Sequence, residues 1–137
     1  MAGYAPENLI RFAVLFGSRA KEKAVREDSD FDVAVYLRED KKLAADFGLY
    51  TNILEFIGKV LDVPEDKIDL VDLKDANILL RYHIARDGRL IFGNRREFEQ
   101  YRLFAIRDYY DARRLFKIGE NLVKRRQHLL AKKIASL

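Results

Sequence analysis

Two short stretches decide the fold: LFGSRA at residues 15–20 and DSDFDV at residues 28–33. LFGSRA ends one run of branched apolar residues, and DSDFDV leads into another. Such runs are typical of buried strands. Gly17 lacks a side chain, so the backbone there can approach a ligand closely, and Ser18 can offer its hydroxyl and nearby amides to a phosphate. Because Gly-Ser is also common in ordinary turns, this turn alone fits either a phosphate site or a purely structural role.

Two aspartates stand at the start of the second predicted strand. Asp30 and Asp32 lie two residues apart, and side chains of a strand alternate between its faces, so both carboxylates fall on one face, about 6 to 7 Å apart along the chain. A solvent-facing edge strand would also explain such a pair. Here apolar residues occupy both faces of 31–37, which predicts that the acids lie at the rim of a half-buried face.

Such a carboxylate pair is costly unless a cation neutralises it, because the charges repel each other and are partly buried. Magnesium is the expected cation, since it prefers oxygen ligands and leaves room for phosphate oxygens and water. Asp69, in the predicted strand IDLVDL at residues 68–73, offers a third carboxylate from a neighbouring strand. Asp72 has the opposite parity on that strand and is expected at a strand end or turn.

Taken together, LFGSRA, DSDFDV and IDLV resemble the nucleotidyltransferase superfamily, specifically its minimal nucleotidyltransferase (MNT) antitoxin branch. The resemblance covers residues 9–93 in element order. It implies that Gly17 and Ser18 hold the triphosphate of ATP, with Arg19 near a terminal phosphate. It also implies that the catalytic residues, which bind magnesium as cofactor, are Asp30, Asp32 and Asp69.

MNT antitoxins are encoded with HEPN-domain RNase toxins, and some attach AMP from ATP to a toxin tyrosine. The resemblance therefore implies an enzyme, a protein adenylyltransferase that transfers AMP from ATP to a hydroxyl, expected to be a tyrosine, of a cognate HEPN toxin and so neutralises it. The alternative is a noncatalytic antitoxin that keeps the fold and binds the toxin. The chain is too short for the extra domains of polymerising relatives, so the acceptor is expected to be a protein.

Two other classes are not favoured. A HEPN RNase relies on an arginine that precedes a histidine on a helix, with four to six residues between them, and no arginine precedes His83 or His128 at that spacing. Both histidines are predicted to be ordinary helix-surface or packed residues. Direct nucleic-acid binding is not expected, because the aromatic residues near the C-terminus recur at helical spacing and are expected in the core.

Length and composition predict one compact domain. The chain has 137 residues, of which 49% are hydrophobic and 35% charged. No apolar run reaches the ~18 to 20 residues of a membrane-spanning helix, and no signal-peptide pattern begins the chain, so we expect a soluble, cytoplasmic protein with no membrane contact. The absence of cysteine excludes disulfides, thiolate metal sites and cysteine nucleophiles.

The hydrophobic periodicity predicts the α/β (α+β) class: a small nucleotidyltransferase fold with a mixed sheet of three to four strands, helices packed on it and a C-terminal helical tail. Residues 1–94 form the predicted core and 95–137 a basic helical extension of the same domain. Apolar residues in the extension are spaced as one stripe, and Gly119 is a position where its helix could kink or end. The expected strands are 9–16, 31–37, 68–73 and 89–92, and the expected helices are 42–61, 76–86 and a long helix from 95, with one or two helical turns at 19–26.

Charge is divided unevenly along the chain. Residues 1–94 hold 14 Lys/Arg and 17 Asp/Glu, whereas residues 95–137 hold 12 and 5, giving −3 and +7. A basic tail favours a polyanion or an acidic protein as partner, although a solvated helix face would show the same charges. Because apolar residues recur in this tail, we expect a mixed docking site in which the apolar residues supply affinity and the charges supply association rate.

Overall fold

The computed structural model describes residues 5–17 and 30–136. Ser18, Arg19 and the helical turns predicted at 19–26 lie outside the described residues. Within these ranges, none of the helices has both the length and the apolar character that crossing a membrane requires. In chain order the elements are α1 (Pro6–Leu9), β1 (Ile10–Phe16), β2 (Phe31–Leu37), η2 (Leu43–Ala45), α2 (Phe47–Leu61), η3 (Glu65–Lys67), β3 (Ile68–Asp72), α3 (Ile78–Asp87), β4 (Arg89–Gly93) and α4 (Arg95–Ala135).

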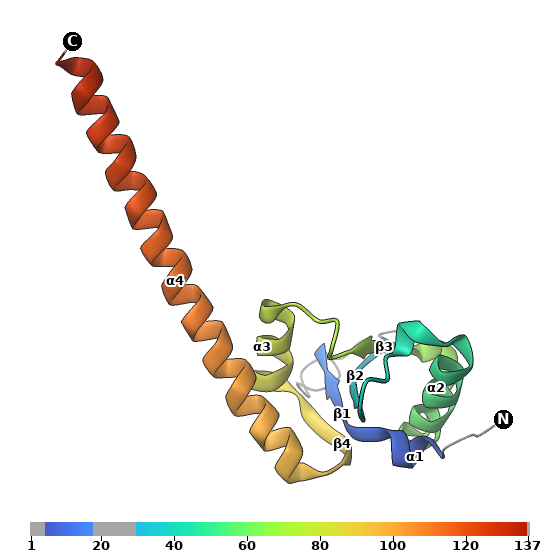
Figure 1. Cartoon of the computed structure of the whole chain (residues 1–137). Coiled ribbons are helices and arrows are strands. Elements are labelled where there is room, and N and C mark those ends of the chain that lie inside the picture. The colour runs from blue at the N-terminus through green and yellow to red at the C-terminus, as the bar shows by residue number, and fades with distance from the viewer. Residues whose placement is uncertain (1–4, 18–29, 137) are drawn as a thin grey trace.

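A mixed four-stranded sheet lies at the centre of the protein, in the order β3-β2-β1-β4 (Figure 1). β1 is antiparallel to both β2 and β4, whereas β2 and β3 are parallel. The parallel pair is possible because α2 connects β2 to β3 and returns the chain to the end of the sheet where β2 began. The end of β1 and the beginnings of β2 and β3 therefore meet at one end of the sheet. The predicted mixed sheet is confirmed.

Apolar clusters cover both faces of the sheet. On one face Val33 and Val35 pack with residues of α2 such as Ile57. On the other face Ala34 and Tyr36 belong to a second cluster, to which α3 and α4 contribute. The prediction of a second apolar cover on the aspartate side of β2 is confirmed, and this cover determines what surrounds the acids.

The helix predicted at 42–61 begins later than expected. The Asp46 carboxylate accepts a hydrogen bond from the backbone N–H of Gly48 at 2.9 Å and caps α2, while Leu43–Ala45 forms a separate 3-10 turn. The apolar spacing continues through the cap, so periodicity alone placed the start of the helix too early.

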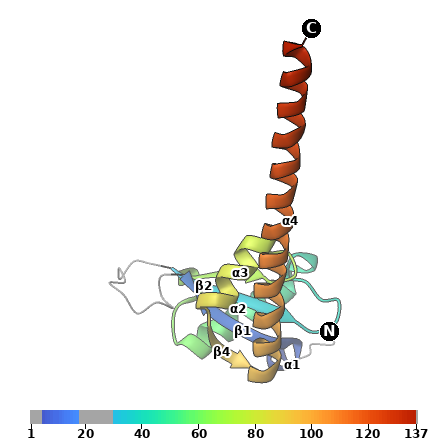
Figure 2. The same cartoon turned by 90° about the vertical axis from the view of Figure 1, so that its left-hand side faces the viewer.

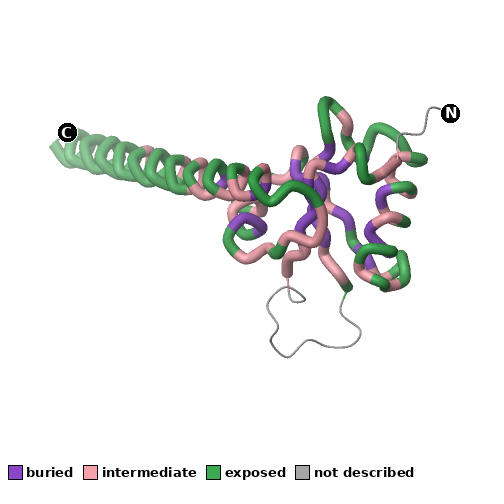
Figure 3. Tube along the Cα trace, turned by 90° about the horizontal axis from the view of Figure 1, so that it is seen from below, coloured by how far each residue is buried: buried purple, intermediate pink, exposed green. Residues whose placement is uncertain are grey.

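α4 is one unbroken helix of 41 residues. Its first part packs on the body, where Phe98 and Ala105 are buried, and its remainder extends away from the body (Figures 1 and 2). Gly119 lies inside the helix and does not end it, and a methyl group added there would contact nothing within 4 Å. The prediction that the aromatic residues near the C-terminus are core was wrong for Tyr110 and Phe116, which are 51% and 70% exposed. Figure 3 shows exposed residues along the far part of α4.

Candidate active site

Asp32 and Asp69 lie side by side on neighbouring strands. They are register partners in the parallel pair of β2 and β3, and adjacent strands are about 4.8 Å apart. Asp32 precedes Ala34 by two residues and Asp69 precedes Val71 by two, so both acids belong to the face that α3 and α4 cover. Asp32 is half-buried and Asp69 is exposed. The fold thus brings together two of the three predicted carboxylates.

The third predicted carboxylate, Asp30, is exposed and comes directly before β2. The pKa of Asp32 is raised above its ordinary value. Burial is the largest cause, followed by the negative charge of Asp69 and then by that of Asp30. The ionised form of Asp32 is therefore disfavoured by its surroundings. A cation placed between these carboxylates would reverse that effect.

Gly17 lies against the Asp32 carboxylate. Phe16 is the register partner of Asp32, so the turn leaves β1 beside this side chain. Gly17 has a φ of +76°, and a Cβ atom added there would lie 2.6 Å from Oδ2 of Asp32. The backbone conformation favours glycine, and a larger residue would also force the Asp32 carboxylate or the turn to shift. The sequence predicted a close backbone approach at Gly17, and in the structure the group approached is the carboxylate itself.

The donor set fits a magnesium ion. Asp32 and Asp69 present carboxylate oxygens from two rigid strands, and such oxygens are the ligands that magnesium prefers. Within residues 5–17 and 30–136, no three acidic or histidine side chains form a complete metal-binding group. The assignment of Asp32, Asp69 and Asp30 as ligands of this ion stays a prediction.

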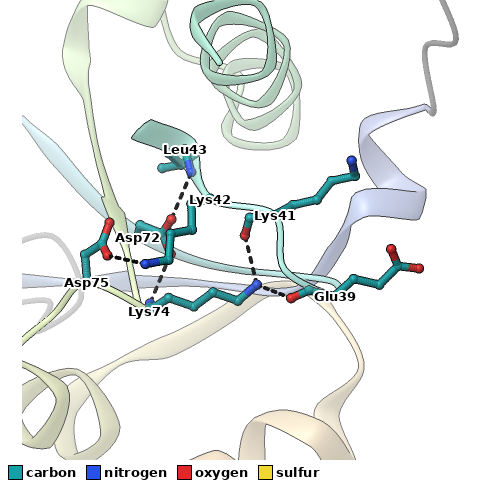
Figure 4. A network of polar contacts seen from close by, with 7 residues as sticks. All are labelled: Glu39, Lys41, Lys42, Leu43, Asp72, Lys74 and Asp75. Atoms are coloured by element: carbon teal, nitrogen blue, oxygen red, sulfur yellow. Dashed lines mark hydrogen bonds and ion pairs between the residues drawn. The ribbon is translucent and has the colours of Figure 1, made fainter. Parts of the chain in front are cut away.

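Asp72 has a different role from Asp69, although both belong to β3. Its buried carboxylate accepts hydrogen bonds from the backbone N–H groups of Leu43, at 2.9 Å, and Lys74, at 3.0 Å (Figure 4). The Lys74 ammonium in turn donates to the carbonyl oxygens of Glu39 and Lys41. Asp72 thus ties the end of β3 to the segment that precedes α2, in agreement with its predicted place at a strand end.

The two histidines take no part in this site. Both are exposed, His83 on α3 and His128 on the far part of α4. Nδ1 of His83 lies 3.4 Å from Nη2 of Arg86, one turn along the same helix. The prediction that both are ordinary helix residues agrees with these positions.

A cavity of about 460 Å³ opens elsewhere on the same face. Its lining includes Arg11, Tyr36, Lys74 and Tyr101. Tyr36 lies four residues beyond Asp32 on β2, which places it about 13 Å along the strand from the acids. The cavity is therefore separate from the carboxylate pair, and no motif in the sequence had indicated it.

Comparison with known proteins identifies the family. Residues 3–97, which include the turn at Gly17 and all three aspartates, match the family described as polymerase beta, nucleotidyltransferase. The chain belongs to this nucleotidyltransferase family. The resemblance predicted from LFGSRA, DSDFDV and IDLV is confirmed.

Individual relatives of this nucleotidyltransferase agree with that result. A protein adenylyltransferase, MntA, from Aphanizomenon flos-aquae (strain 2012/KM1/D3) is 32% identical over 91 residues, which cover 61% of this chain and 57% of the relative. The chain thus spans little more than half the length of that curated relative.

Solved structures confirm the fold. A toxin–antitoxin structure with AMP-PNP has a TM-score of 0.57 and 25% identity, covering 82% of this chain and 86% of the other. A chain from the structure of a tri-AMPylated Shewanella oneidensis HEPN toxin in complex with an MNT antitoxin has a TM-score of 0.52 and 23% identity, and the match covers 82% of this chain and 83% of that chain. The predicted nucleotidyltransferase fold with a mixed sheet and a long C-terminal helix is therefore confirmed.

Proposed function

We propose that this nucleotidyltransferase is the antitoxin of a toxin–antitoxin pair and transfers AMP from ATP to a tyrosine hydroxyl of a cognate HEPN toxin. The observation that carries the proposal is the Asp32–Asp69 pair beside the backbone of Gly17. The name of the Aphanizomenon relative and the AMP-PNP in the toxin–antitoxin structure support the donor and the reaction. Since ATP and the RNase substrates of such a toxin are cytoplasmic, we infer the same location for this chain.

In the proposed reaction the acceptor hydroxyl oxygen forms a bond to the α-phosphorus of ATP. The bond from that phosphorus to the oxygen bridging the α and β phosphates breaks, and pyrophosphate leaves. Asp69 is the exposed carboxylate of the pair and takes the hydroxyl proton, while the turn at Gly17 brings backbone to the triphosphate. Magnesium held by Asp32 and Asp69, with Asp30 close by, would neutralise charge on the phosphate oxygens.

The test uses the cognate HEPN toxin, which we expect to be encoded in the neighbouring open reading frame. With magnesium and ATP labelled at the α-phosphorus, we expect label on a tyrosine of that protein and loss of its RNase activity. ATP labelled at the γ-phosphorus should transfer nothing, which separates adenylylation from phosphorylation. Neutralisation of the RNase with no α-label on it would instead show the alternative, an antitoxin that acts by binding alone.

A further inference from the structure

The far part of α4, residues 113–135, here called the arm, has no cover in the described structure. Every arm residue except Gly119 is exposed, and the arm projects from the body (Figures 1 and 2). In proteins most of the stability of a helix comes from packing of its apolar face, and a large exposed apolar surface marks an interaction site. The arm carries eight large apolar side chains that are 49% to 70% exposed: Leu115, Phe116, Ile118, Leu122, Val123, Leu129, Leu130 and Ile134.

These apolar side chains share one side of the arm. The pairs 115/116, 122/123 and 129/130 recur every seven residues, and with the other two they occupy roughly 160° of the circumference at 3.6 residues per turn. Such a stripe is wide enough to lie in a groove between helices of a partner. We call this side the apolar stripe.

Two cations lie in the middle of the apolar stripe. Arg126 and Lys133 are seven residues apart and project from its centre, whereas Lys117 and Lys124 lie on the opposite side of the same helix. The only acid of the arm, Glu120, lies outside the stripe. A partner that covers the stripe must therefore neutralise Arg126 and Lys133 with its own carboxylates.

This charge pattern argues against a second copy of the chain as the partner. Packing two stripes together would bring the central cations of both copies into one apolar interface that contains no acid. We propose that the apolar stripe docks into an apolar groove of the HEPN toxin whose carboxylates pair with Arg126 and Lys133. The toxin as partner rests on the proposed function, whereas the need for an acidic groove rests on the arm alone.

The experiment compares two double charge reversals in the full chain. Arg126→Glu with Lys133→Glu changes the centre of the stripe, and Lys117→Glu with Lys124→Glu makes the same change in net charge on the opposite side. Affinity for the HEPN toxin is measured by calorimetry without ATP, and helix content by circular dichroism. We expect the stripe reversal to weaken binding by about 30-fold or more, as for loss of a desolvated charge pair, and the control reversal by less than about 3-fold.

The other outcomes would overturn the inference. Equal losses in both reversals would indicate general electrostatic attraction, such as that of an RNA, and no loss in either would place the toxin elsewhere. Arm-dependent dimers in sedimentation, dispersed by Leu122→Asp, would show a second copy as the occupant. AMP transfer is measured in parallel. If the toxin is adenylylated but the stripe reversal does not weaken its binding, only the docking proposal is refuted. If binding depends on the stripe but no AMP is transferred, only the catalytic proposal is refuted.

Discussion

Replacing Asp32 by asparagine is expected to lower the rate of AMP transfer to the toxin by at least about 100-fold. In the proposed site, the change removes one of the two charges that would hold the cation against the nucleotide. A bound cation contributes several kcal/mol to such reactions, and about 1.4 kcal/mol corresponds to each factor of ten in rate. Asp69→Asn should cause a similar loss, because Asp69 is the register partner of Asp32. The measurement is the initial rate of α-label transfer under saturating toxin.

The same variant should be at least as stable as the parent protein without metal. Burial and the charges of Asp69 and Asp30 raise the pKa of Asp32, so the folded chain binds its proton more tightly than the unfolded chain. The free energy of unfolding of the metal-free protein should therefore rise as pH falls through the raised pKa, and decline as pH rises through it. Asp32→Asn should remove that dependence, which denaturant unfolding at several pH values can measure.

Asp72→Ala is the matched control for these changes. Its carboxylate is buried and accepts two backbone hydrogen bonds, so its loss should lower the free energy of unfolding by about 1 to 3 kcal/mol. The protein that remains folded should still transfer AMP. If Asp32→Asn retained the full rate, or lost it only in proportion to unfolding, the assigned role of the carboxylate would be wrong.

Gly17→Ala is expected to lower AMP transfer by about 10-fold or more without disrupting the sheet. The added Cβ would lie 2.6 Å from Oδ2 of Asp32, and at a φ of +76° a non-glycine residue costs on the order of 1 to 3 kcal/mol. Either the turn or the carboxylate must shift, and each belongs to the proposed site. Transfer rates and circular dichroism of the variant give the comparison.

Gly119→Ala provides the control for the same substitution elsewhere. A methyl group there meets nothing within 4 Å in this structure, and alanine favours the helix, so helix content should rise slightly. Because Gly119 lies within the apolar stripe, transfer is compared at saturating toxin, where docking affinity does not limit the rate, and it should be unchanged there. Equal transfer by Gly17→Ala and the parent protein would contradict a close approach of the turn to the working carboxylate.

Much of this site could be predicted from the sequence because it depends on short-range periodicity. The alternation along β2 placed Asp32 opposite the face of Val33 and Val35, and the parity of β3 separated Asp69 from Asp72. The motifs then gave the family. What joins Asp32 to Asp69 is the register of two parallel strands, which depends on how α2 returns the chain and is not encoded in any local pattern.

Other features could not be predicted for identifiable physical reasons. The contact of Gly17 with Asp32 depends on the exact path of the turn at the end of β1. Periodicity showed an apolar side on the last helix, but it cannot show whether the chain itself supplies the cover, and Phe116 proved to be exposed. Gly119 did not interrupt α4, since a single glycine costs only about 1 kcal/mol in a helix. Roles for Ser18 and Arg19 stay predictions.

The most direct test of the carboxylate centre is cation binding. Manganese is titrated in place of magnesium into the protein with a non-hydrolysable ATP analogue, and the relaxation of water protons reports the protein-bound ion. We expect nucleotide-dependent binding by the parent protein and by Asp72→Ala, and its loss in Asp69→Asn, because Asp69 supplies a ligand whereas Asp72 is held by backbone N–H groups. Undiminished manganese binding by Asp69→Asn would contradict a cation site built on Asp32 and Asp69.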